Sequence, residues 1–420
     1  MRKKIGLACV ASVLLVSCSG EERTQDTLQI ALWDEDADDA VTAAIASFNE
    51  IHPDIDVQVT YTPFAQYWTN LSTSMGAGSG PDLFWMNAVN FHRYADSGLI
   101  KDLDPFVEAD AEYDKEDYYE NAVELYSYED SLYAAPYFVD AIALVYNKEL
   151  FDEAGVDYPD ETWTWEDLEE AGAALTDEEA GVYGYGATIT SNQRGYYNLI
   201  HQAGGQIVSD DGLYSGFGTE AALEALQFSE HLIEEGISPG VRMQIESAMT
   251  QLFQSEMVAM YPELSPMLGE VVEALGDKVE VAPLPSHKED APIIHGIGWA
   301  MNEDVVDPSV AWDLLRELTS ETGNAEIADS GFSTPAMISQ GERWLESTPS
   351  INLEVFLEAQ ETGAPYPVSN NTAEWQRVEQ TEIQGAFLGQ KTIEEALETV
   401  ANEMDQILQE GIDVEEEGDE

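Results

Sequence analysis

The sequence predicts an α/β fold built from open sheets and divided between two units. Strand-like apolar runs alternate with segments whose apolar residues recur at helical spacing, which is typical of open α/β sheets. The chain has 420 residues, and the roughly 400 that would remain after an N-terminal leader exceed the usual size of one domain. Apolar residues make up 44% of the chain and aromatic residues 10%, so each unit can bury a large core.

The first unit begins with a strand, a helix, a strand, a helix and a strand. The expected ranges, in that order, are residues 28–33, 41–52, 55–61, 67–75 and 82–86. The third of these, IDVQVTY, alternates apolar and polar side chains as a half-buried strand does. The segment GAGSGP that follows the second helix ends it, because glycine and proline both disfavour continued helix.

The rest of the chain continues this alternation. Strands are expected within 132–147 and at 258–261, 279–284 and 293–301. Helices are expected at 165–175, 221–235, 247–253 and 309–319. Connections that contain proline or glycine are expected at 283–292 and 330–335, and the remainder is expected to be helical to about residue 410.

The N-terminus has the pattern of a secretion signal. Basic residues 2–4 precede an apolar stretch at 5–16, which is shorter than the roughly 20 residues that span a bilayer. The sequence LVSC at 15–18 resembles a bacterial lipobox, which implies a signal peptide at 1–17, acylation of Cys18 and a lipidated tether at 18–27. The alternative is an ordinary cleavage site beside an unmodified cysteine. Because Cys9 would be removed, neither a disulfide framework nor a cysteine metal site is expected.

The charge of the chain is strongly acidic. Lysine and arginine number 16 against 83 aspartate and glutamate residues, for a formal net charge of −67. Such a chain is not expected to bind nucleic acid or an anionic surface. Two interpretations remain open, a solvated halophilic surface and an acidic cleft that selects a cationic ligand. Residues 411–420 are interpreted as an acidic tail.

Several short strings, in a fixed order, resemble the extracellular sugar-binding proteins, the group that contains maltose-binding protein. GPDLFW at 80–85 is a closer match than the others, and TWTWEDL at 162–168 and GIGWA at 296–300 are part of its ordered sequel. The others are at 48–57, 94–100, 136–148, 202–205 and 253–260. Each string alone is weak, but together they extend in order over nearly the whole chain after the signal peptide.

The resemblance implies a two-lobed fold of the type II periplasmic-binding-protein kind, with hinge-linked open sheets. The N-lobe would comprise residues 27–136 plus 294–332, and the C-lobe residues 140–284 plus 336–410. The ligand would lie between lobes that close around it. The implied role is the substrate-binding component of an ABC importer, with a mono- or oligosaccharide ligand and the permease subunits as partners. It would act as a monomer, without enzymatic activity, metal or cofactor, and outside the cytoplasm, held at the membrane by Cys18.

Sugar binding requires flat aromatic rings for the C–H faces of a pyranose and polar side chains for its hydroxyls. Candidates lie where predicted strands end or cross between lobes, because open sheets bind ligands there. The family places ligand contacts after the third strand, at the first crossing and at a C-lobe helix. The candidate residues are Trp33, Asp34, Phe64, Trp85, Asn87, Asn90, Asp140, Tyr196, Tyr197, Glu263, Trp299 and Trp375. Around Glu263 the sequence PELSP departs from the Gly-x-Trp common in the family, which leaves ring stacking on that side open.

Other interpretations compete with this one. Each candidate aromatic residue could simply pack in a core, which is the commoner role of such residues. The main rival function is a receptor for a cationic solute such as a polyamine or basic peptide. A secreted glycosidase and a lipoprotein scaffold without a small-molecule ligand are two further alternatives. No HExxH, Walker-type, GxSxG or GxGxxG motif is present.

Overall fold

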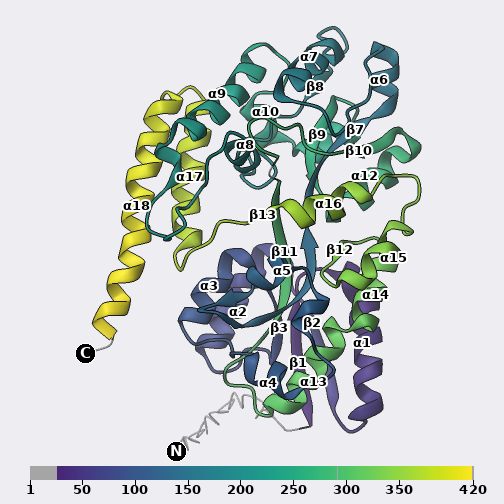
Figure 1. Ribbon diagram of the computed structural model, residues 1–420, viewed down its shortest axis with the longest axis vertical. Helices are drawn as coiled ribbons and strands as arrows, with labels where there is room; N and C mark the ends of the chain where they lie inside the picture. Colours follow the sequence, from purple (N-terminus) through teal and green to yellow (C-terminus); the bar gives the residue numbers. More distant parts are fainter. Residues whose placement is uncertain (1–25, 291, 419–420) are drawn as a thin grey trace, which may run out of the picture.

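The computed structural model describes residues 26–290 and 292–418 and contains two larger sheets, one in each half of the molecule (Figure 1). The first has seven strands with the main order β12-β6-β11-β3-β1-β2, and β13 pairs with β11. The second has four strands in the order β10-β7-β9-β8. Helices pack around both sheets, so the α/β class predicted from the sequence is confirmed.

The first sheet starts with three parallel strands, β1 (Thr27–Leu32), β2 (Asp56–Tyr61) and β3 (Leu83–Asn87). The helices that connect and follow them are α1 (Asp38–Ile51), α2 (Phe64–Gly76) and α3 (Ala88–Asp96). Because the strands are parallel, their carboxyl ends meet at one edge of the sheet. The residues that follow these strands are therefore brought close together.

Later segments complete this sheet. The strands β6 (Ala134–Asp140), β11 (Ile293–Met301), β12 (Thr334–Pro335) and β13 (Ala364–Pro365) add to it, and β11 lies antiparallel between β3 and β6. The other elements of this half are α4 (Asp104–Ala109), α5 (Glu120–Glu124), β4 (Ser127–Tyr128), β5 (Ser131–Leu132), α13 (Pro308–Thr319), α14 (Glu321–Ser330) and α15 (Gly341–Leu345). The helices α13 and α14 pack on α1.

The second sheet is formed by β7 (Ile142–Asn147), β8 (Tyr183–Tyr185), β9 (Val258–Leu264) and β10 (Val279–Ala282). Its helices are α6 (Lys148–Ala154), α7 (Trp165–Leu175), α8 (Tyr196–Gln202), α9 (Glu220–Glu234), α10 (Val241–Glu246), α11 (Met249–Gln254), α12 (Leu268–Leu275), α16 (Glu354–Thr362), α17 (Thr372–Phe387) and α18 (Ile393–Gly418). Helix α7 has the bounds predicted from the sequence, because a capping box of Thr164 and Asp167 fixes its first turn.

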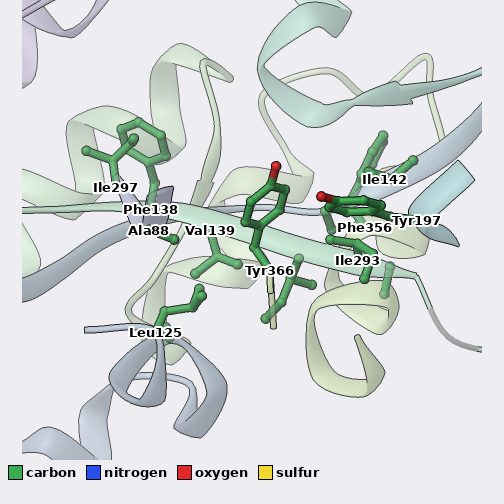
Figure 2. Close-up of a cluster of buried hydrophobic side chains, with 14 of the residues drawn as sticks. Ala88, Leu125, Phe138, Val139, Ile142, Tyr197, Ile293, Ile297, Phe356 and Tyr366 are labelled. Carbon is green, nitrogen blue, oxygen red and sulfur yellow. The ribbon is translucent and has the colours of Figure 1, made fainter. Parts of the chain in front are cut away.

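The chain passes between the two sheets from β6 to β7, from β10 to β11, and again after β12. A buried apolar cluster surrounds these crossings (Figure 2). Its labelled members are Ala88, Leu125, Phe138, Val139, Ile142, Tyr197, Ile293, Ile297, Phe356 and Tyr366. The two halves therefore share one continuous core at their junction.

The expectation of continuous helix after residue 335 is wrong for several segments, among them residues 346–353 and 363–371. Between α16 and α17 the chain is extended, and its short strand β13 pairs in parallel with the start of β11. Pro365 and Pro367 lie in this segment, and proline lacks the N–H that a helix interior needs. The segment brings Tyr366 to the junction of the two sheets.

Candidate functional site

An aromatic cluster lies at the carboxyl ends of β1 and β3. The Trp33 ring centre is 5.5 Å from that of Phe64 and 4.9 Å from that of Trp85. Phe64, the first residue of α2, has 53% of its surface exposed, and Trp33 is half-buried. These two rings therefore form the accessible part of the cluster and offer an apolar face to a ligand.

Trp85 and Trp299 lie behind this accessible pair. Both are fully buried and directly opposite each other on β3 and β11, with ring centres 6.0 Å apart. Tyr137 is 6.0 Å from Trp299 in the same core. Trp85 therefore contacts Trp33 directly, and Trp299 packs against Trp85 in the core.

Asn87 and Asn90, two predicted site residues with amide side chains, lie at the same edge of the sheet. Asn87 is the N-cap of α3, and its Oδ1 accepts hydrogen bonds from the backbone N–H of Asn90 at 3.2 Å and from its Nδ2 at 3.0 Å. Asp34 has a similar local role, since its Oδ1 accepts from the backbone N–H of Asp36 at 3.0 Å. These bonds fix the start of each helix and hold the side chains at the edge.

A hollow of about 280 Å³ lies between α3 and the start of α17. One wall comes from the first sheet's half and consists of Val89, Asn90 and Arg93. The opposite wall consists of Asn370, Asn371, Ala373, Glu374 and Arg377. The two helices approach each other from different halves of the molecule (Figure 1), so this hollow lies between the lobes. Of the predicted residues only Asn90 lines it.

The second wall is anchored by a buried hydrogen-bond network around Glu379. The Tyr196 hydroxyl donates to Glu379 Oε1 at 2.5 Å, and the Tyr197 hydroxyl donates to Oε2 at 2.6 Å. Asn192 Nδ2 donates to Oε1 at 3.2 Å, and Tyr366 donates to Asn192 Oδ1 at 3.3 Å. Burial raises the pKa of Glu379 to about 7, although these donors act in the opposite direction. Tyr196 and Tyr197 thus hold α17 in place from within the core.

Two more predicted residues are buried in the second half. Trp375, on α17 beside the hollow, donates from Nε1 to the Ser369 hydroxyl at 2.9 Å. Glu263, on β9, accepts from Arg194 Nη1 at 2.9 Å on both of its oxygens, and from the Thr250 hydroxyl at 2.6 Å. Both carboxylate oxygens of Glu263 therefore accept hydrogen bonds from protein donors.

Asp140 ends β6 at the first crossing. Its Oδ1 accepts from the Ser333 hydroxyl at 2.8 Å, which joins the first crossing to the third. It is paired in the sheet with His295 on β11, which belongs to the second crossing. Burial raises the pKa of Asp140 to about 7 and lowers the pKa of His295 to about 4.

The structure thus places eight of the twelve predicted residues in three groups, while Asp34, Asp140, Glu263 and Trp375 each have separate partners. Trp33, Phe64, Trp85 and Trp299 form the aromatic cluster, Asn87 and Asn90 lie at the start of α3, and Tyr196 and Tyr197 belong to the Glu379 network. Sequence reasoning did not find Arg93, Arg377 or Glu379. A usable signal existed for Glu379, which lies four residues from both Trp375 and Ile383 on the apolar face of α17.

Within residues 26–290 and 292–418, no group of three or more histidine, cysteine, aspartate or glutamate side chains is arranged to hold a metal ion. The helices of the same ranges include none with the length and apolar character that crossing a bilayer requires. Cys18 lies outside the described residues.

Residues 31–325 match the family described as bacterial extracellular solute-binding protein. Among curated relatives, the arabinooligosaccharide-binding protein of Halalkalibacterium halodurans is 28% identical over 61% of this chain and 58% of that protein. The arabinooligosaccharide-binding protein of Bacillus subtilis is 23% identical over 70% of this chain and 69% of that protein.

Solved structures show the same fold. An ABC substrate-binding protein from Listeria monocytogenes, in complex with cycloalternan, has a TM-score of 0.84 at 24% identity and covers 91% of this chain and 99% of that chain. Maltose-bound MalE3 of T. maritima has a TM-score of 0.77 at 21% identity, and the match covers 91% of this chain and 99% of that chain. The predicted two-lobed fold is therefore confirmed. Because the family match covers well over half of the sequence, the chain belongs to the bacterial extracellular solute-binding proteins.

Proposed function

We propose that this protein is the substrate-binding component of an ABC importer, which captures a carbohydrate between its two lobes and delivers it to the permease subunits. Membership of the solute-binding family supports a receptor role. Two relatives named for arabinooligosaccharides, and a structural neighbour in complex with cycloalternan, support a saccharide ligand. The proposed role is capture and release of the solute as a monomer, without catalysis.

The observation that carries this proposal is the accessible ring pair Trp33 and Phe64 at the sheet edge where Asn87 and Asn90 also lie. An apolar ring face beside amides matches the two surfaces of a pyranose. The interlobe hollow argues against the rival cationic ligand. It contains two arginines and a single carboxylate, that of Glu374, and would repel an ammonium group.

The residues that contact the ligand and the limits of the two lobes are also proposed. We propose that Trp33, Phe64, Asn87 and Asn90 bind the solute directly, with Trp85, Trp299, Tyr196, Tyr197 and Trp375 supporting them. The lobes would meet near Asp140, with the N-lobe at 27–136 plus 294–332 and the C-lobe at 140–284 plus 336–410. Within the last range, α15 and β13 belong to the first sheet's half. The acidic surface would be adapted to high salt, because 16 basic residues cannot neutralise 83 acidic ones.

A thermal-shift screen of saccharides, polyamines and basic peptides tests the function. We expect a saccharide to raise the melting temperature, since a ligand at 100 times its Kd adds about 2.7 kcal/mol of stability. The affinity of a neutral saccharide should change little between 0.15 M and 1 M NaCl, whereas a cationic ligand in an acidic site would lose affinity. Stabilisation by polyamines or peptides, with none from any saccharide, would overturn the proposal.

Lipid anchoring through Cys18 is a separate part of the proposal and needs its own test. It is supported by the LVSC sequence alone. We expect Cys18→Ser to move the protein from the membrane fraction to the soluble fraction in cells. The matched control is Cys9→Ser, inside the proposed signal peptide, which should leave the mature protein at the membrane. Unchanged membrane association of Cys18→Ser would contradict anchoring at this residue.

A further inference from the structure

Positive charge is scarce in this protein and almost all of it is neutralised locally. Within the described ranges, every lysine and arginine except Arg93 and Arg242 has a carboxylate oxygen within 4.0 Å. The guanidinium carbon of Arg93 lies 5.6 Å from the centre of the Tyr94 ring, and Arg93 is exposed in the hollow between the lobes. A cation with no carboxylate oxygen within 4.0 Å is therefore located at the candidate site.

Arg377 faces the same hollow from α17. Its contact with Glu374 is long, at 4.0 Å, and the two side chains are 74% and 58% exposed. Exposed pairs of this kind contribute little, so the guanidinium can exchange this partner for another anion. In contrast, the carboxylates of Glu263 and Asp110 hold Arg194 and Arg316 at 2.9 and 3.0 Å.

The charges that line the hollow are two guanidinium groups and one carboxylate, so the formal balance favours a ligand with a single negative charge. Asn90, Asn370 and Asn371 line it too and can bind hydroxyl groups. The first turn of α17, at Ala373 and Glu374, also reaches the hollow and adds the positive end of a helix. A volume of about 280 Å³ lies near the lower limit for small-molecule sites.

We infer that the saccharide bound by this protein is acidic and that Arg93 and Arg377 bind the carboxylate of a uronate residue from opposite lobes. This inference rests on the proposed saccharide function. A planar guanidinium matches a carboxylate in geometry and can donate two parallel hydrogen bonds to it. Because one arginine comes from each wall, the carboxylate also links α3 to α17 when the lobes are closed.

Binding of matched saccharides to the mature chain tests the inference. Calorimetric titrations would compare digalacturonate with 1,4-galactobiose and glucuronate with glucose, and an array of neutral and uronate-containing oligosaccharides would extend the comparison. We expect the uronate form to bind at least about tenfold more tightly than its neutral counterpart. Arg93→Gln and Arg377→Gln should each reduce that ratio about fivefold or more.

Arg242→Gln is the matched control, because Arg242 is also exposed and without a nearby carboxylate but does not line the hollow. Equal loss of uronate preference in Arg242→Gln would contradict a local role for the two arginines. If only neutral saccharides bind, the inference is overturned and the saccharide function stands. If no saccharide on the array binds, both are overturned. Tighter binding of galactose 1-phosphate than of any uronate would overturn the assignment of the carboxylate.

Discussion

The aromatic cluster around Trp33 and the network around Glu379 stabilise different halves of the molecule by different physical means. The cluster consists of rings with centres 4.9 to 6.0 Å apart, and the Nε1 groups of Trp85 and Trp299 have no hydrogen-bond partner among the described residues. The network instead joins one buried carboxylate to three donors at 2.5 to 3.2 Å.

The aromatic cluster and the Glu379 network should therefore respond differently to substitutions and to pH. The stability of packed rings depends mainly on filled volume, so it is sensitive to changes in side-chain size. A buried hydrogen-bond network depends on every donor and acceptor, so it holds α17 in one position. We therefore expect the aromatic side to respond to volume changes and the α17 side to respond to pH.

The largest expected effect is on the aromatic side. Trp85→Ala removes a fully buried ring and should lower the free energy of unfolding by about 3–5 kcal/mol, through lost burial and the cavity left behind. Denaturant unfolding would measure it. Phe64→Ala is the control, because that ring is 53% exposed and its removal should change stability by about 0.5 kcal/mol or less. A loss below about 1 kcal/mol for Trp85→Ala would show that the site can collapse around the missing ring.

The next effect concerns the network and pH. Since the pKa of Glu379 is raised from 4.5 to about 7, the folded protein binds a proton that the unfolded chain releases between these values. The stability that this group contributes is therefore present below about pH 4.5 and is lost as pH rises to about 7, by on the order of 3 kcal/mol. Asp140 acts in the same direction, and His295, with its pKa lowered to about 4, acts in the opposite one.

Glu379→Gln keeps the side-chain shape and removes the titrating group. Unfolding free energies at fixed salt should therefore fall less steeply between pH 4.5 and 7 in this variant than in the parent protein. Glu398→Gln, on the exposed side of α18, serves as the control and should keep the parent slope. Identical slopes in the parent and Glu379→Gln would mean that the carboxylate stays ionised throughout this range.

The smallest expected effect is on ligand affinity at the accessible ring. Phe64→Ala should weaken saccharide binding by about 0.5–1.5 kcal/mol, a factor of roughly 2 to 10, because one stacking face is lost. Calorimetric titration with the best saccharide from the screen would measure it. Tyr214→Ala provides a matched control, since Tyr214 is 52% exposed on a loop of the second half. An unchanged Kd for Phe64→Ala would move the stacking contact away from this ring.

Most of the fold could be predicted because its signals are local. The alternation at 55–61 and the capping box before Trp165 each depend on a few neighbouring residues. The strand β13 was missed because its pairing with β11 joins segments about 70 residues apart. Trp33 and Phe64 could be named as candidate site residues from the sequence because each follows a predicted strand.

The α17 side of the site was harder to predict for a physical reason. Arg377 and Arg93 line one hollow only because two lobes pack together, and no local sequence pattern encodes which helices meet there. Glu379 is one of 83 acidic residues, and its burial depends on donors nearly 190 positions earlier in the chain.

The position of β11 has a consequence for how the chain folds. This strand lies between β3 and β6 in the first sheet, yet it spans Ile293–Met301. The sheet therefore lacks a central strand until about 300 residues have been synthesised, and its closure requires contacts between distant segments. Such contacts slow folding, because the entropy of closing a long loop must be lost before the contacts form. A nascent chain of this kind should remain unfolded long enough to be threaded through a secretion channel.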